Sequence, residues 1–150
     1  MTRHLKIAAI IFLIISALGF LDAAYLAIDH YRGNIPPCTI QGCEIVLTSA
    51  QSKIAGVPVA LLGALYYFTL LILSIAYLDK KNEMLIKIAS KLTPLGFVAS
   101  LYFVYLQFFT IKAICQYCMA SATTSTLLFI TGMYIIVKMR HRSGGVEIKK

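Results

Sequence analysis

The chain has 150 residues, of which 59% are hydrophobic and only 13% are charged, and its net charge is +8. A soluble domain carries roughly a quarter charged residues, so this composition excludes an ordinary water-soluble protein and indicates one folded in lipid. The positive charge does not indicate nucleic-acid binding, because it is concentrated at the ends of long apolar stretches.

Four stretches of the chain are long and apolar enough to cross a bilayer, which requires about 20 residues. They cover residues 7–28, 57–78, 92–111 and 113–137. The first is too long for a secretory signal and predicts a retained span. Because lipid offers the backbone no hydrogen-bond partner, all four are expected to be helices. The sequence therefore predicts an all-α membrane protein, a four-helix bundle that forms a single domain over residues 1–150.

The basic residues divide unequally between the two sides of this bundle. Eleven of the fourteen fall on one side: Arg3, Lys6, Lys80, Lys81, Lys87, Lys91, Lys138, Arg140, Arg142, Lys149 and Lys150. Only Arg32, Lys53 and Lys112 fall on the other. The positive-inside rule places the eleven, and with them both termini, in the cytoplasm. We interpret these clusters as topology signals that contact lipid headgroups.

The longest segment between spans covers residues 29–56, and the charge distribution places it outside. Within it, residues 43–56 (CEIVLTSAQSKIAG) are expected to form a short helix against the membrane surface. Pro58 and Pro94 are expected in the first turns of the second and third spans, where a missing N–H group costs little.

All four cysteines fall on the predicted external side. Cys38 and Cys43 lie in the loop after the first span, and Cys115 and Cys118 form a C-x-x-C motif at the external end of the fourth. Three interpretations are open: static disulfides that staple the loops, a four-thiolate zinc site, and two pairs that exchange disulfides. Disulfides persist in oxidising compartments, which disfavour thiolate zinc sites, so we expect no metal and favour exchange.

The position of the C-x-x-C motif supports disulfide exchange. Residues three apart share a helical face, and a helix N-terminus favours the thiolate, which is the nucleophile. Turnover requires an electron acceptor, and the sequence contains no haem, flavin or iron–sulfur motif. A lipid-soluble quinone of the ubiquinone or menaquinone type is therefore expected. The residues that could line its site are Tyr66, Tyr67, Phe103, Tyr105 and Phe108.

Asp22 lies inside the first predicted span, where a charge is costly and usually functional or paired. It is expected either to handle protons as quinol forms or to be protonated and hydrogen-bonded to a neighbouring helix. The sequence leaves both alternatives open.

Together these features resemble the vitamin K epoxide reductase family, specifically its microbial members. The likeness rests on Cys38 and Cys43, on Ser49 six residues later, on GVPVALLGALYY at residues 56–67, and on the CQYC sequence that opens the fourth span. It covers nearly the whole chain, and the combination of motifs is specific where C-x-x-C alone is not.

The resemblance implies a four-helix bundle around a quinone and a relay of disulfides that supports disulfide formation outside the cytoplasm. Cys38 would face a DsbA-like or other thioredoxin-fold partner, Cys43 would shuttle between Cys38 and Cys115, and Cys118 would react with the quinone. Ser49 would steady the loop by hydrogen bonding. Since no thioredoxin domain is fused to the chain, the partner is expected to act in trans. The protein would reside in the cytoplasmic membrane, with its active site on the external face.

Two positions depart from the animal members of the family. The animal members carry a tyrosine four residues after the second C-x-x-C cysteine, where this chain has Ala122. They also carry a substrate-contacting asparagine where this chain has Val59. These differences disfavour the alternative of an animal-type quinone or vitamin K epoxide reductase. A non-enzymatic membrane protein with stapled loops is the other alternative. A DsbB-type oxidase is disfavoured, because its C-x-x-C lies in the first external loop.

Overall fold

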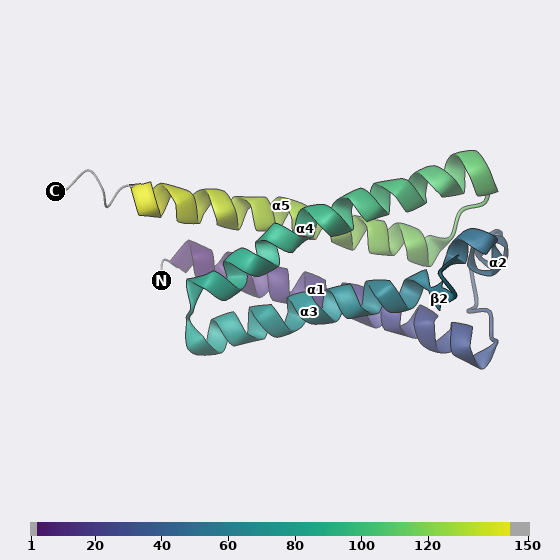
Figure 1. Cartoon of the computed structure of the whole chain (residues 1–150), viewed down its shortest axis with the longest axis horizontal. Helices are drawn as coiled ribbons and strands as arrows, with labels where there is room; N and C mark the ends of the chain where they lie inside the picture. Colours follow the sequence, from purple (N-terminus) through teal and green to yellow (C-terminus); the bar gives the residue numbers. More distant parts are fainter. Residues whose placement is uncertain (1–2, 145–150) are drawn as a thin grey trace.

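The computed structural model describes residues 3–144, and four long helices dominate it (Figure 1). They are α1 (Arg3–Arg32), α3 (Val59–Lys80), α4 (Glu83–Tyr105) and α5 (Gln116–Gly144), and a π-helical segment, η2 (Leu106–Ile111), extends α4. All four are long and apolar enough to cross a membrane. The predicted all-α, four-helix membrane fold is confirmed.

The helices close into a ring around one core. α1 packs against α3 and α5, and α4 packs against α5 and α3. The largest fully buried apolar side chains of this core are Tyr77, Phe12, Leu5, Leu70, Ile86, Leu128 and Ile135. The outer faces are apolar as well: Leu21, Leu65, Leu95 and Ile130 are each more than half exposed. Helices that are apolar all round require an apolar solvent, so the surface agrees with burial in lipid.

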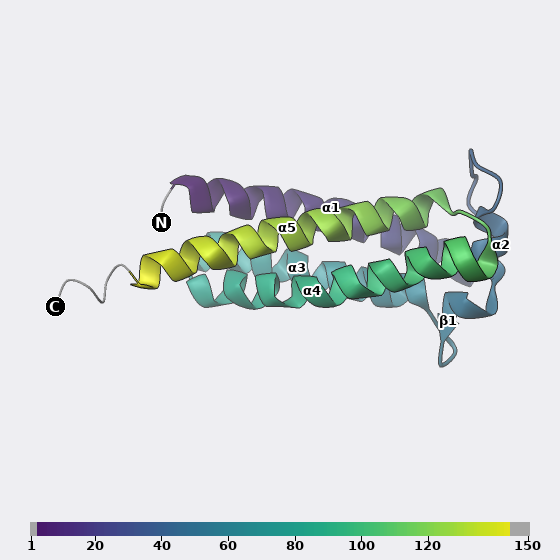
Figure 2. The same ribbon diagram turned by 90° about the horizontal axis from the view of Figure 1, so that it is seen from above.

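The two ends of the bundle differ (Figures 1 and 2). The start of α1, the end of α5 and the α3–α4 turn lie at one end, whereas the α1–α3 loop and the α4–α5 connection lie at the other. The basic residues Lys80, Lys81 and Arg142 belong to the first end. Lys149 and Lys150, which contributed to the charge argument, lie outside the described residues.

The α1–α3 loop is more structured than a simple connection. It contains α2 (Cys43–Thr48), which covers only the first part of the helix predicted over residues 43–56, and a 3-10 turn, η1 (Ala50–Ser52). A small hairpin follows, in which β1 (Lys53–Ile54) pairs antiparallel with β2 (Val57–Pro58). The sequence analysis did not predict this hairpin, because two strands of two residues leave too short a pattern to detect.

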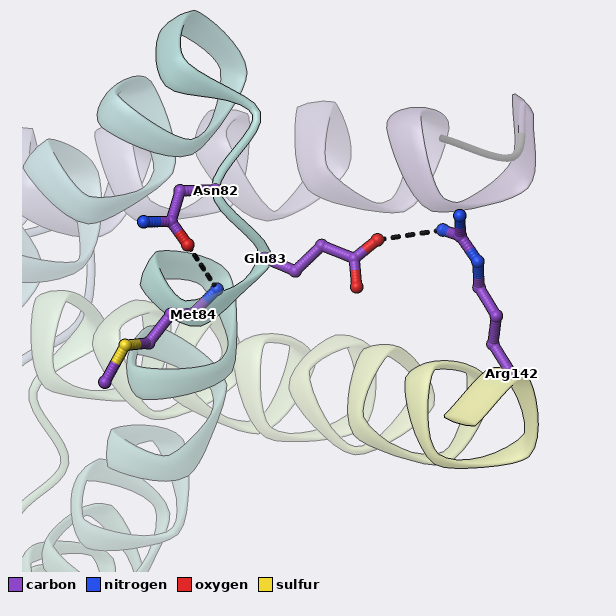
Figure 3. A network of polar contacts seen from close by, with 4 residues as sticks. All are labelled: Asn82, Glu83, Met84 and Arg142. Atoms are coloured by element: carbon purple, nitrogen blue, oxygen red, sulfur yellow. Dashed lines mark hydrogen bonds and ion pairs between the residues drawn. The ribbon is translucent and has the colours of Figure 1, made fainter. Parts of the chain in front are cut away.

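Helix boundaries differ from the predicted ones. Pro58 belongs to β2, so α3 starts after it rather than around it, and α5 starts at Gln116. α4 starts at Glu83 rather than at residue 92, which puts Pro94 in the helix interior. The reason is a local cap: Asn82 accepts a hydrogen bond from the Met84 N–H (3.0 Å; Figure 3), and such caps begin helices.

The same corner contains the ion pair of Figure 3. Glu83, in the first turn of α4, accepts a hydrogen bond from Arg142 near the end of α5 (2.8 Å). Both side chains are close to half exposed, at 45% and 49%. Water therefore competes with this pair, whereas the cap satisfies a backbone donor that has no helical partner.

We expect Asn82→Ala to lower the free energy of unfolding by about 1 kcal/mol, the typical cost of removing a cap. Glu83→Gln should change it less, since exposed ion pairs contribute ~0–1 kcal/mol. Unfolding of the purified variants in mixed detergent micelles measures both. A larger loss in Glu83→Gln than in Asn82→Ala would contradict this assignment.

Candidate active site

The first pair of cysteines is joined in the α1–α3 loop. A disulfide links Cys38 and Cys43, whose Cα atoms are 6.3 Å apart. Cys43 begins α2 and is only 1% exposed, whereas Cys38 is half-buried in a segment whose neighbours Thr39 and Ile40 face the surface. Cys38 is thus the outer sulfur of the pair and Cys43 the inner one. The disulfide leaves two free thiols, fewer than a four-thiolate zinc site needs.

The second pair lies at the start of α5. Cys115 immediately precedes the helix and is fully buried, and Cys118 follows in the first turn and is partly accessible. Cys43, Val46, Ala113 and Cys115 form one buried apolar cluster, and Cys38 and Cys118 pack against it. The structure therefore brings both pairs together at one end of the bundle, with Cys43 and Cys115 at the centre.

Gly42 allows the loop to approach the second pair closely. A Cβ atom at this position would lie 3.0 Å from the Ile114 carbonyl oxygen and 3.1 Å from its nitrogen. The backbone of Gly42 has φ +128, a conformation that L side chains rarely adopt. Any other residue would push Cys43 away from Cys115 or strain the turn before α2.

Two hydrogen bonds tie the loop to α5. The Tyr117 hydroxyl donates to the Pro37 carbonyl oxygen (2.9 Å), and the Thr39 N–H donates to Oε1 of Gln116 (3.2 Å). Both bonds join the residues next to Cys38 with residues of the C-x-x-C motif. They hold the loop over the second pair from the solvent side.

Gln107 binds the backbone of the segment that carries Cys115. It is 2% exposed within the π-helical η2 segment, and its side-chain Oε1 accepts a hydrogen bond from the Cys115 N–H (2.9 Å). Its backbone oxygen accepts another from the Ala113 N–H (3.2 Å). π-Helical turns often occur at functional sites, and here the extra backbone residue helps to aim a buried amide at Cys115.

The surroundings of Cys115, which precedes the membrane-spanning part of α5, favour its thiolate. The hydrogen bond from the Cys118 thiol contributes most to lowering the pKa of Cys115 below its usual range, and the N–H groups of Cys118 and Tyr117 add to it. Burial and the charge of Asp22 oppose this effect but do not reverse it. A thiol of low pKa is a good leaving group in disulfide exchange.

A cavity of about 370 Å³ opens beside the second pair, between α1, α3, α4, α5 and the loop. Cys118 lines it, and the other three cysteines do not. Of the residues predicted to line a quinone site, Tyr66, Tyr67 and Phe103 belong to its wall. Val59 and Ala122, at the positions where animal members carry asparagine and tyrosine, belong to it as well. Tyr105 and Phe108 lie outside it on the molecular surface, 55% and 49% exposed. Their helical positions turn them away from the bundle.

Ser49 also lines the cavity, at the end of α2. Its hydroxyl donates to the Val46 carbonyl oxygen (2.7 Å), which satisfies one of the free carbonyl groups at the helix C-terminus. The resemblance implied a serine that steadies the loop, and this role of Ser49 stays a prediction.

The walls of the cavity suit a mainly apolar molecule with a few polar atoms. The Tyr67 hydroxyl is engaged, because it donates to the Ser121 carbonyl oxygen (2.9 Å) and lies 3.0 Å from the Thr124 hydroxyl. Two other polar atoms, Oδ2 of Asp22 and Oγ of Ser125, are buried without a partner among the described residues. Buried polar atoms are nearly always paired. These two atoms therefore fit a ligand that carries oxygen atoms for hydrogen bonding, as a quinone does.

Sequence reasoning missed several residues of this site. Gln107 is a lone amide within the apolar run LYFVYLQFFTI, and Ser121 and Ser125 follow Cys118 at the helical spacing that shares its face. The sequence therefore contained a signal for each of these three residues. Gly42 carried no signal, because only the folded loop shows what its missing side chain leaves room for.

A membrane bundle that holds one bonded and one free cysteine pair beside an apolar cavity defines a membrane thiol–disulfide oxidoreductase. The model of the Vitamin K epoxide reductase family matches residues 10–133, and the chain belongs to this family. Its members are quinone-dependent disulfide oxidoreductases, so this protein is an enzyme of that class. A comparison with curated proteins finds no match.

Replacing Gly42 with Ala should separate the two cysteine pairs. The new Cβ would meet the Ile114 backbone, so we expect electron transfer from the loop pair to the second pair to slow about tenfold or more, as small misplacements of reacting groups do. Rapid mixing of the protein with a reduced dithiol, followed by alkylation and mass spectrometry of each pair, measures this step. Reduction of the Cys38–Cys43 disulfide itself is the internal control and should keep its rate.

Replacing Cys118 with Ala should raise the pKa of Cys115, because the largest stabilisation of its thiolate is lost. The ultraviolet absorbance of the thiolate, titrated in a background that carries Cys38→Ser and Cys43→Ser, reports this pKa. Cys118→Ser keeps a hydrogen-bond donor and should raise it less. Equal pKa values in the two variants would show that the Cys118 side chain does not control the ionisation of Cys115.

Proposed function

We propose that the protein oxidises a reduced thioredoxin-fold partner, DsbA-like in type, and passes the two electrons to a quinone of the ubiquinone or menaquinone type. The observation that carries this proposal is the order of the four sulfurs. Cys38 lies on the solvent side, Cys43 and Cys115 meet in one buried cluster, and Cys118 lines the cavity. Each neighbouring pair in this order corresponds to one exchange of a disulfide.

The first exchanges take place at the loop. A thiolate of the partner attacks Cys38, and Cys43 leaves as a thiolate. The partner's second thiol then releases Cys38, and the partner departs oxidised. Because Cys38 is the outer sulfur, a macromolecule can reach it, whereas the buried Cys43 is protected from outside thiols.

The next exchanges transfer the electrons inward. Cys43 attacks Cys115 of an oxidised Cys115–Cys118 pair, and Cys118 leaves. Cys38 then attacks Cys43, which re-forms the loop disulfide and releases Cys115. The low pKa of Cys115 favours this release.

The electrons then leave the protein at Cys118. Re-forming the Cys115–Cys118 disulfide releases two electrons and two protons, and a bound quinone supplies an acceptor for both. The apolar wall around Cys118 would hold its ring, with Tyr66, Tyr67 and Phe103 as the aromatic part of that wall. Val59 and Ala122 offer the cavity no polar side-chain atom, which argues against animal-type epoxide reduction.

The distribution of charge supports the orientation. The end of the bundle with the α3–α4 turn carries the basic residues, and the positive-inside rule assigns such an end to the cytoplasm. The cysteine pairs at the opposite end would then face the external side of the cytoplasmic membrane. A partner outside the cytoplasm and a quinone in the lipid can both reach them there, and the relay would support disulfide formation in that compartment.

Catalytic oxidation of a reduced thioredoxin-fold protein by the purified chain, with quinone present, tests the proposal. Cys118→Ser should reduce multiple turnover to the uncatalysed rate and accumulate a Cys43–Cys115 mixed disulfide, seen as a cross-linked peptide. Cys38→Ser should block oxidation of the partner, while a reduced Cys115–Cys118 pair still delivers electrons to quinone. Sustained turnover in Cys118→Ser would refute the terminal step.

A further inference from the structure

Asp22 lies in the cavity that Cys118 lines. It belongs to α1 and is the one carboxylate among the described residues of the wall. The other titratable side chains of the wall are His30 of α1, Tyr66 and Tyr67 of α3, and Cys118 of α5. α4 and the loop contribute none, and no described lysine or arginine lines the cavity. Among the described residues of the wall, no lysine or arginine is therefore available to pair with the carboxyl group.

The environment of Asp22 is unusual for a structural residue. Its Oδ2 atom is buried, and no described residue forms a hydrogen bond with it. A carboxyl group in a membrane helix is costly unless it is paired or functional. The sequence left two roles open for Asp22, and one of them was a hydrogen bond to a neighbouring helix. No described residue forms such a bond with Oδ2.

A second polar atom in the same cavity lacks a partner. Oγ of Ser125 is buried, and the residue is 1% exposed within α5, on the helical face of Cys118. Two unpaired oxygens from two different helices thus belong to one cavity wall. Cys118 belongs to the same wall, so the carboxyl group and the terminal thiol face one cavity.

We propose that Asp22 is the proton-transfer residue of the terminal step, taking the proton of the Cys118 thiol and passing it to the electron acceptor in the cavity. This role rests on the proposed function. Formation of the Cys115–Cys118 bond breaks two S–H bonds and releases two electrons and two protons. The quinone takes up both electrons and both protons, and Asp22 carries one proton and returns to its starting state.

Among the other titratable groups of this wall, His30 lies near the end of α1, about 12 Å along the helix from Asp22. The Tyr67 hydroxyl is held by Ser121 and Thr124, and neutral tyrosines are poor bases near neutral pH. A carboxylate within an apolar wall is a far stronger base. Positioned general bases typically contribute about 100-fold or more to a rate.

The test compares Asp22→Asn with the unchanged protein in a single turnover. The Cys115–Cys118 pair is first reduced, quinone is added, and re-formation of the disulfide is followed by rapid alkylation. We expect Asp22→Asn to slow this step about 100-fold near neutral pH. The loss should shrink at alkaline pH, where hydroxide can take the proton of the Cys118 thiol in place of Asp22. A defect that is only structural would not diminish as the pH rises.

Asp29→Asn is the matched control, because Asp29 is a carboxylate on the same helix that does not line the cavity. It should leave the rate of the single turnover unchanged. Asp22→Glu, which retains a carboxyl group, should recover part of the rate. Stoichiometric oxidation of a reduced partner by the oxidised Asp22→Asn protein, without quinone, confirms that this variant is folded.

A second readout requires no quinone. Infrared difference spectra between the oxidised and reduced Cys115–Cys118 pair should contain a carboxyl band that Asp22→Asn removes and Asp29→Asn retains. An Asp22→Asn protein with unchanged rate, pH profile and infrared spectrum would overturn the role of Asp22 alone. If the unchanged protein fails to pass electrons to quinone at all, the proposed function fails and this role fails with it.

Discussion

The close approach of the α1–α3 loop to the start of α5 is the constraint on which the site depends. Disulfide exchange needs two sulfurs in contact, yet Cys43 and Cys115 come from segments far apart in the chain. The absence of a side chain at Gly42 lets the loop approach the Ile114 backbone, and the bonds from Tyr117 to Pro37 and from Thr39 to Gln116 hold it there. Cys43 and Cys115 are both buried in the cluster that this approach creates.

The four cysteines differ chiefly in what surrounds them. Cys38 is half-buried in the loop, Cys43 and Cys115 are buried, and Cys118 lines the cavity. In the proposed function, these differences separate two reactions that would interfere if they shared one sulfur: exchange with a partner in water and electron transfer to a molecule in lipid. The bundle then keeps the electron donor apart from the electron acceptor, and the loop connects their two sites.

The cavity combines an apolar wall with a few polar atoms whose bonding differs. Tyr67 is satisfied by the backbone and hydroxyl groups of α5, and the absence of a side chain at Gly96 leaves room for the Tyr66 ring. Asp22 and Ser125 keep unpaired buried oxygens, which costs stability unless a ligand completes them. The unpaired oxygens therefore lower the stability of this wall while they leave it ready for a ligand, as is common where a site is preformed.

The sequence by itself determined the four spans, because lipid imposes long apolar helices whatever the details of packing. It also determined the grouping of the four cysteines, since the order of the spans assigns all four to the same end of the bundle. The family resemblance read from the motifs agrees with the family model, which matches residues 10–133. The position of Gly42 in the site was decided only by the tertiary structure. So was the exclusion of Tyr105 and Phe108 from the cavity, since aromatic residues at the end of an apolar helix look alike whether they face lipid or ligand. Helical periodicity fixes which residues share a face, but which face turns inward depends on the packing of the other three helices.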